Sequence, residues 1–138
     1  MIQRILVAYD TSEQALKAFQ FAIEVAAKFN AVVTVLSVAR LPEPAEIVET
    51  TGVLESAKEY YENHFRMLKE IAEAHQQTFL PIVKVGHPAE QILRTADEEK
   101  SDMIVMGHRG KSFVERWLLG SVSKRVLSYA TCTVSIVR

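Results

Sequence analysis

Short apolar runs alternate along the chain with longer stretches whose apolar positions lie three and four residues apart. The short runs are continuous, which is typical of strands that are covered on both faces of a sheet. They predict five strands, over 5–8, 32–38, 79–85, 103–106 and 134–137. Pro81 lies inside the third run, and because proline cannot donate a ladder hydrogen bond, we expect that strand at an edge of the sheet.

The periodic stretches predict four helices, over 11–30, 54–75, 88–96 and 122–130. Thr11 or Ser12 can cap the first helix, and Gln14 is placed after Thr11 as in a capping box. Asn30 is expected to end that helix. The prolines and glycine of 41–52 favour an irregular stretch before the long amphipathic second helix.

Alternating strands and helices predict an α/β fold with a parallel sheet. Right-handed crossovers favour a single doubly wound, flavodoxin-like (Rossmann-like) five-stranded sheet with helices on both faces. Because neither a repeat nor a linker interrupts the pattern, we expect one domain over 1–138. Ligands of such sheets bind beyond the carboxyl ends of the strands, here after Tyr9–Asp10 and Met106–Gly107.

Composition and charge exclude several classes of protein. The 138 residues are 49% hydrophobic and 24% charged, which excludes disordered, collagen-like and coiled-coil chains. With 16 Lys and Arg against 17 Asp and Glu, the net charge is -1, and we expect neither a nucleic-acid nor a membrane partner. The lone Cys132 excludes an intrachain disulfide framework. The apolar segment near Met1 is too short for a signal peptide, so a cytoplasmic location is expected.

Three of the five glycines lie around the end of the fourth strand and the start of the last helix, at Gly107, Gly110 and Gly120. Glycine permits the positive φ and the close backbone approach that a phosphate cradle requires. Ser121 adds a hydroxyl at a helix start, where N–H groups face an anion. Val105 stands where a P-loop or a G-x-G-x-x-G fingerprint needs glycine. The spacing favours a phosphate loop of another kind, with nearby positive charge from Arg109, Lys111 and Arg125.

The pattern Gly107-x2-Gly110-x9-Gly120-Ser121 resembles the signature of the ATP-binding branch of the universal stress protein family. The resemblance covers the whole chain, including the opening strand with its turn, the Gly-x-Pro-Ala segment and the fourth strand, at 5–13, 85–92 and 101–107. Three positions depart from the family pattern: Thr11 stands where glycine is common, His108 where a small polar residue is common, and Thr133 where proline is usual.

The resemblance implies a site for ATP, with Mg²⁺ or Mn²⁺ carried on the phosphates. Asp10 would lie near the ribose or the phosphate-bound metal, and Val38 would meet adenine through its backbone. Met106, Gly107, Arg109 and Gly110 would surround the ribose and phosphates, and 120–123 would hold the phosphate tail through N–H groups and hydroxyls. The implied nucleotide-binding residues are Ala8, Tyr9, Asp10, Val38, Met106, Gly107, Arg109, Gly110, Gly120, Ser121, Val122 and Ser123.

The four histidines show no metal-ligand spacing, so we expect no metal site built by the protein alone. His64 and His75 lie on the apolar stripe of the long helix and are expected to be packed or half-buried. His87 is expected in a turn or cap. His108 lies within the phosphate loop, where a hydrogen bond to phosphate is plausible. For Trp117 and its apolar neighbours, a cover over the nucleotide, a dimer contact and core packing all stay open.

Two functions remain open. The first is an ATP-binding regulatory protein whose bound state acts on an oligomer or on a protein partner that the sequence does not identify. The second is a slow Mg-dependent ATP hydrolase, in which Asp10 or His108 would orient water. No dedicated base is evident, so regulatory binding is favoured and catalytic residues are not assigned.

The last strand is expected at a sheet edge, because five strands in doubly wound order leave the chain end outermost. Val134, Ile136 and Val137 make it apolar, and nothing before Arg138 interrupts it with charge. Proteins either blunt or pair such edges. We therefore expect a homodimer formed by this strand, as the resemblance also implies; the alternative is an edge covered by the last helix or a loop.

Overall fold

Strands and helices alternate throughout the computed structural model, which describes residues 1–41, 47–109 and 119–138. The elements are β1 (Arg4–Ala8), α1 (Glu13–Phe29), β2 (Val32–Ala39), α2 (Ile47–Ala74), β3 (Phe79–Val85), α3 (Pro88–Glu98), β4 (Met103–Gly107), α4 (Ser121–Tyr129) and β5 (Thr133–Val137). No helix within these ranges is both long enough and apolar enough to cross a membrane.

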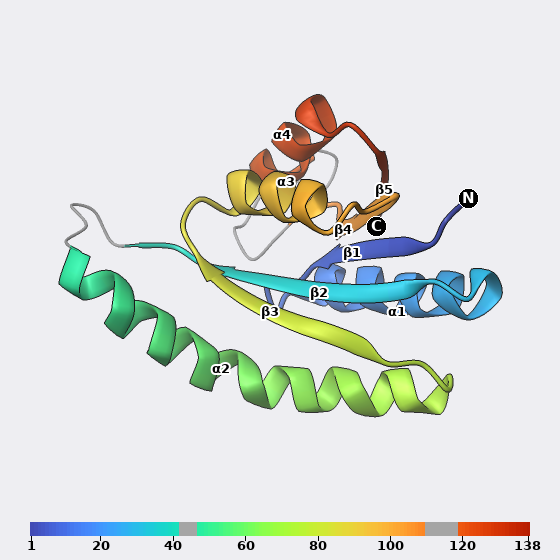
Figure 1. Ribbon diagram of the computed structural model, residues 1–138, viewed down its shortest axis with the longest axis horizontal. Helices are drawn as coiled ribbons and strands as arrows, with labels where there is room; N and C mark the ends of the chain where they lie inside the picture. The colour runs from blue at the N-terminus through green and yellow to red at the C-terminus, as the bar shows by residue number, and fades with distance from the viewer. Residues whose placement is uncertain (42–46, 110–118) are drawn as a thin grey trace.

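The five strands form one parallel sheet in the order β3-β2-β1-β4-β5. Helices α1 and α2 lie on one face of the sheet, and α3 and α4 lie on the other (Figure 1). The chain moves outward from β1 to β2 and β3, and then returns to place β4 and β5 on the other side of β1. This arrangement confirms the predicted doubly wound fold, and it puts the switch point between β1 and β4.

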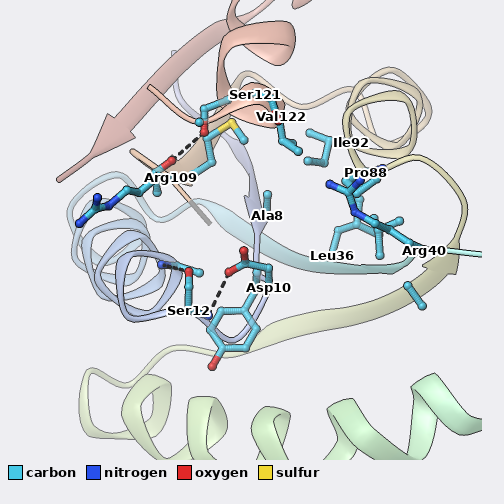
Figure 2. Close-up of a pocket in the computed structure, with 18 of the residues that line it drawn as sticks. Ala8, Asp10, Ser12, Leu36, Arg40, Pro88, Ile92, Arg109, Ser121 and Val122 are labelled. Atoms are coloured by element: carbon cyan, nitrogen blue, oxygen red, sulfur yellow. Dashed lines mark hydrogen bonds between the residues drawn. The ribbon is translucent and has the colours of Figure 1, made fainter. Parts of the chain in front are cut away.

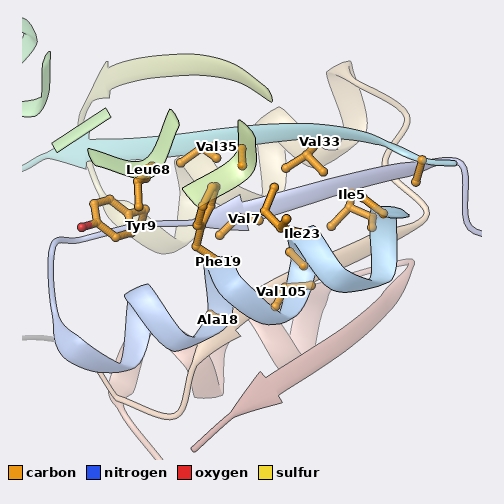
Figure 3. Close-up of a cluster of buried hydrophobic side chains, with 14 of the residues drawn as sticks. Ile5, Val7, Tyr9, Ala18, Phe19, Ile23, Val33, Val35, Leu68 and Val105 are labelled. Atoms are coloured by element: carbon orange, nitrogen blue, oxygen red, sulfur yellow. The ribbon is translucent and has the colours of Figure 1, made fainter. Parts of the chain in front are cut away.

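Each face of the sheet has its own apolar core. On the face of α1 and α2, fully buried side chains of β1, β2 and β4 pack against α1 around Phe19 (Figure 3). The Phe19 ring meets the ring of Phe79 edge to face, with centroids 5.4 Å apart. On the other face, Leu6, Leu36 and Ile104 pack against α3 and α4. The central strands are thus covered on both sides, as their unbroken apolar runs predict.

Helix α1 begins with Ser12 as its N-cap, whose hydroxyl accepts a hydrogen bond from the Ala15 amide at 3.1 Å. Asn30 ends it in the left-handed conformation, with φ 56°. The expected capping box of Thr11 and Gln14 is wrong: Thr11 lies before the cap with φ 70°, so the position three residues after the cap is Ala15.

Helix α2 is longer than the sequence predicts, because it begins at Ile47. The expectation of an irregular stretch through Gly52 is therefore wrong. The two prolines of that stretch precede the helix and cannot break it, and a single glycine in a helix costs only about 1 kcal/mol. Outside the adjoining turns of its own helix, none of the residues that the structure describes lies within 4 Å of where a Cβ on Gly52 would be.

The edges of the sheet are β3 and β5. This confirms the expectation from Pro81, which pairs with Val35 on the inner side of β3. It also confirms the edge position of the last strand, whose residues from Val134 to Val137 are half-buried.

We predict that Phe19→Ala lowers the free energy of unfolding by about 3–5 kcal/mol, since it empties a fully buried site between α1 and the sheet. Phe29→Ala, in the last turn of the same helix, is the matched control, because Phe29 is 50% exposed. Its effect is expected within about 0.5 kcal/mol. Urea unfolding measures both, and equal losses would contradict the assigned core.

Candidate functional site

A cavity of about 400 Å³ opens at the carboxyl ends of β1, β2 and β4. Its volume lies within the range of roughly 300–1,000 Å³ that is typical of small-molecule sites. Every residue of the implied nucleotide site lines it except Gly110, which lies outside the described residues. The lining residues are Ala8, Tyr9, Asp10, Ser12, Ala15, Leu36, Val38, Ala39, Arg40, Tyr61, Pro88, Ile92, Met106, Gly107, Arg109, Gly120, Ser121, Val122 and Ser123.

The loop that leaves β1 gives the cavity its carboxylate. Asp10 Oδ1 accepts a hydrogen bond from the Ser12 amide at 3.0 Å, which fixes the turn into α1. Between them, Thr11 has φ 70°, a conformation that is strained for a β-branched residue. Its hydroxyl lies 3.4 Å from the Tyr60 hydroxyl on α2. The Asp10 turn is therefore held both by its own backbone and by a contact with α2.

The start of α4 gives the cavity an anion-binding end. Gly120 is the N-cap, and within the described chain no side chain caps this helix. The Gly120 amide donates to the His108 carbonyl at 2.9 Å, while the next amides, of Ser121 and Val122, have no acceptor within the helix. Both residues line the cavity. The exposed N–H groups and the positive end of the helix dipole suit a phosphate.

The hydroxyl of Ser123 has a structural role. It donates to the Gly107 carbonyl at 2.8 Å, and the residue is only 4% exposed. Its single proton is thus committed to joining α4 to the end of β4. The expected hydroxyl contact with phosphate can come from Ser121, which is exposed at the mouth of the helix.

Two of the three signature glycines are explained by close packing. A Cβ on Gly107 would lie 2.8 Å from Gln14 Cβ and 2.9 Å from the Gln14 carbonyl carbon, so the first turn of α1 leaves no room for one. A Cβ on Gly120 would lie 3.1 Å from Arg109 Cα. The expected positive φ is wrong for both. Among the described glycines only Gly86 has a positive φ, of 150°.

The remaining lining residues are mostly apolar, and the sequence analysis missed them: Ser12, Ala15, Leu36, Ala39, Arg40, Tyr61, Pro88 and Ile92. Arg40 directly follows β2, so the rule that ligands bind at the carboxyl ends of strands could have found it. Tyr61 comes from α2, and its spacing marks it only as part of an apolar stripe. Nothing in the pattern shows which turn of a 28-residue helix faces the cavity.

The cationic side chains divide into two groups. Arg40 and Arg109 line the cavity, on opposite sides of Ala8 and Asp10 (Figure 2). The expected contribution of Arg125 is not supported, because its guanidinium lies 3.8 Å from a Glu90 carboxylate oxygen and 6.0 Å from the Tyr129 ring. Lys111 lies outside the described residues.

Two tyrosines of the cavity are held protonated. Burial is the main cause that raises the pKa of Tyr9 and of Tyr61, and the negative charge of Asp10 adds to both. The neighbouring Tyr60 also raises the pKa of both. At neutral pH both hydroxyls are therefore hydrogen-bond donors.

The positions of the four histidines agree only in part with the sequence predictions. His64 is half-buried, with its ring 6.2 Å from the ring of Tyr9, as expected. His75 is exposed, so the expectation that it is packed or half-buried is wrong. It directly follows the last residue of α2, and its Nδ1 lies 3.1 Å from the Ile71 carbonyl oxygen. His87 is the N-cap of α3 but makes no side-chain cap. His108 is buried and is not part of the cavity lining, which gives no support to a phosphate contact.

Within the described ranges, no group of three or more His, Cys, Asp or Glu side chains is placed to hold a metal ion. Cys132 is half-buried beside the core under α3 and α4, and burial raises the pKa of its thiol. Trp117, for which the sequence leaves open a nucleotide cover, a dimer contact and core packing, lies outside the described residues.

Fold and cavity together define an α/β protein with a cavity at the switch point of a parallel sheet, where such folds bind their ligands. Residues 1–138 match the model of the Universal stress protein family, and the chain belongs to that family. It is 38% identical to a universal stress protein of Thermus aquaticus over 142 residues, with both chains fully covered. It is 32% identical to one of Methanocaldococcus jannaschii, over all of this chain and 83% of the relative.

Solved structures share the fold. The universal stress protein UspA from Lactobacillus plantarum matches with a TM-score of 0.88 at 23% identity, over 99% of this chain and 98% of that one. A universal stress protein in complex with cAMP matches with a TM-score of 0.76 at 27% identity, over 99% and 97%. One from Archaeoglobus fulgidus in complex with dAMP matches with a TM-score of 0.68 at 23% identity, over 100% of both chains.

We predict opposite effects of the same substitution at two glycines. Gly107→Ala should lower the free energy of unfolding by about 1–3 kcal/mol, because the new methyl group would collide with the backbone of α1. Gly52→Ala should raise it by about 0.5–1 kcal/mol, because the site is open and lies inside a helix. Thermal and urea unfolding measure both; a neutral Gly107→Ala would contradict the packing described here.

Proposed function

We propose that this chain is an ATP-binding regulatory protein, in which the bound nucleotide acts on the oligomer or on a protein partner. The observation that carries the proposal is the division of the cavity. Arg109 and Ser121, at the uncapped start of α4, lie on one side, and apolar side chains that include Leu36 and Ile92 lie on the other (Figure 2). A nucleotide has the same division, with phosphates at one end and a planar base at the other.

The comparisons support a nucleotide as ligand. The related protein solved with cAMP is 27% identical to this chain and covers 99% of it. Its ligand, like ATP, is an adenine nucleotide. ATP is proposed for this chain because the pattern of Gly107, Gly110 and Gly120 resembles that of the ATP-binding branch, and because Arg109 and a helix start can balance phosphate charge.

A divalent ion fits this site as a companion of the phosphates. Asp10 is the acidic side chain of the cavity lining, and carboxylate oxygen is a preferred ligand of Mg²⁺ and Mn²⁺. One carboxylate with phosphate oxygens and water is the usual way in which proteins hold Mg²⁺ on a nucleotide. Such an ion would neutralise phosphate charge, and Asp10 would orient it.

The alternative function is slow hydrolysis of ATP. Hydrolysis needs a residue that positions water at the terminal phosphate and charge that stabilises the transition state. Arg109 can supply the charge and Asp10 can orient the water. Single-turnover release of ADP distinguishes the two functions: release that Asp10→Ala abolishes favours the hydrolase, and retention of intact ATP over hours favours regulation.

We predict that Ser121→Asp weakens ATP binding tenfold or more while leaving the fold as stable or more stable. A carboxylate at the first position of α4 suits the helix dipole, worth about 0.3–1 kcal/mol, but it repels phosphates at the same place. Ser121→Ala is the matched control, since it removes the hydroxyl without adding charge. Calorimetric titration with ATP and Mg²⁺, together with thermal unfolding, measures both properties.

Two outcomes would count against the proposed function. Wild-type protein that binds FMN or NAD but gives no heat with ATP would show that the ligand is wrong. Ser121→Asp with undiminished ATP affinity would show that phosphates do not lie at the start of α4.

We further propose that β5 pairs with its own copy in a homodimer. The strand is an edge, and its residues Val134, Ile136 and Val137 are only partly covered by their own chain. Antiparallel pairing about a two-fold axis would satisfy the free edge and cover the apolar side chains.

For this dimer we predict that Ile136→Lys and Ser135→Pro each produce a monomer at micromolar concentration. Leu127→Lys is the control, because Leu127 is 50% exposed on α4, outside β5. Sedimentation equilibrium gives the mass, and circular dichroism checks that each variant stays folded. A wild-type monomer, or folded variants that remain dimers, would refute this interface.

A further inference from the structure

The two arginines of the cavity occupy chemically different surroundings. Arg109 follows β4 and lines the cavity together with Gly120 and Ser121, at the end where phosphates are proposed. Arg40 follows β2 and lines the cavity together with Val38 and Ala39. A phosphate role suits Arg109, but the surroundings of Arg40 call for another explanation.

The side chain of Arg40 lies over the apolar end. In Figure 2 its guanidinium is beside Pro88, near Ile92 and Leu36, and across the cavity from Arg109. It makes no hydrogen bond or ion pair with any residue that the structure describes. Arg66 and Arg125, by contrast, each lie within 4 Å of a carboxylate. Arg40 thus places a planar cation over an aliphatic wall at the mouth of the cavity.

We propose that Arg40 is a specificity-determining residue, whose guanidinium stacks on the base of the bound nucleotide and holds it against Leu36, Val38 and Ile92. The inference rests on the proposed nucleotide binding. A guanidinium is planar and weakly hydrated, and it stacks on aromatic faces, which a lysine ammonium cannot do in the same way. The aliphatic wall covers one face of the base, and Arg40 covers the face toward solvent.

Stacking makes a different prediction from simple charge attraction. If Arg40 binds phosphates, its effect should be the same with a ligand that has no base. If it stacks, its effect should vanish with such a ligand, and it should be larger for a purine than for the smaller ring of a pyrimidine. Lysine at position 40 keeps the positive charge but lacks the planar guanidinium. If Arg40 stacks, Arg40→Lys should therefore weaken binding as much as Arg40→Ala does.

The test is calorimetric titration of wild type, Arg40→Ala and Arg40→Lys with ATP, CTP and inorganic tripolyphosphate, all with Mg²⁺. We expect both variants to bind ATP about 3- to 20-fold more weakly than wild type, in keeping with the range known for cation–π contacts. Their preference for ATP over CTP should narrow, and their affinity for tripolyphosphate should be unchanged. Arg94→Ala, at an exposed arginine of α3 outside the cavity, is the control and should match wild type.

Three results would overturn the inference. Arg40→Lys with wild-type ATP affinity would show that charge alone matters. An equal loss of ATP and tripolyphosphate affinity would place Arg40 on the phosphates. Arg40→Ala with unchanged ATP affinity would remove Arg40 from the site. In each of these three results the wild type still binds ATP, so the proposed function is not contradicted. A wild type that does not bind ATP would contradict both the proposed function and the role of Arg40.

Discussion

The close contact between the end of β4 and the first turn of α1 is the constraint on which the cavity depends. Without a side chain at Gly107, the backbone of Gln14 and Ala15 can lie directly against the strand. This approach brings the Asp10 turn and the end of β4 to opposite sides of one opening, so that Ser12 and Arg109 share it. The hydrogen bond from Ser123 to the Gly107 carbonyl then brings the start of α4 to the same place.

Because of that arrangement, the cavity has a polar part and an apolar part. The cavity is polar where α1 and α4 begin, because the first amides of a helix lack partners within it. It is apolar where strands β1 and β2 and the side of α3 form its walls, because those residues extend the two cores of the sheet. Leu36 and Ile92 belong both to the core under α3 and to the cavity lining. The same apolar side chains therefore stabilise the fold and shape the proposed base site.

The sequence predicted most of this architecture because its main signals are local. Continuous apolar runs mark buried parallel strands, Pro81 marks an edge, and Asn30 and Pro88 mark helix ends, all as the structure has them. Tyr9, Asp10, Met106 and Gly107 of the cavity lining also followed, because strand ends converge at the switch point of any doubly wound sheet. The glycine spacing and the family resemblance supplied the other predicted lining residues. These predictions needed no knowledge of distant contacts.

What the sequence could not predict depends on packing between distant segments. The reason for Gly107 is a clash with Gln14, 93 positions away in the chain, and no local rule gives it. The start of α2 was misplaced because Gly52 and the preceding prolines predict irregular structure, whereas Gly52 lies inside the helix. Tyr61 was missed because an amphipathic stripe shows which face is apolar and not what each turn contacts.

The position of Tyr61 along α2 has a mechanical consequence. Helix α2 is 28 residues long, and Tyr61 lies near its middle, where it forms part of the cavity wall. At 1.5 Å per residue, each end of the helix is about 20 Å away. A tilt of about 5° around Tyr61 therefore moves either end by roughly 2 Å, which is enough to change how a surface fits a neighbouring molecule. A rotation of α2 about Tyr61 would thus displace the helix ends much further than the ring itself.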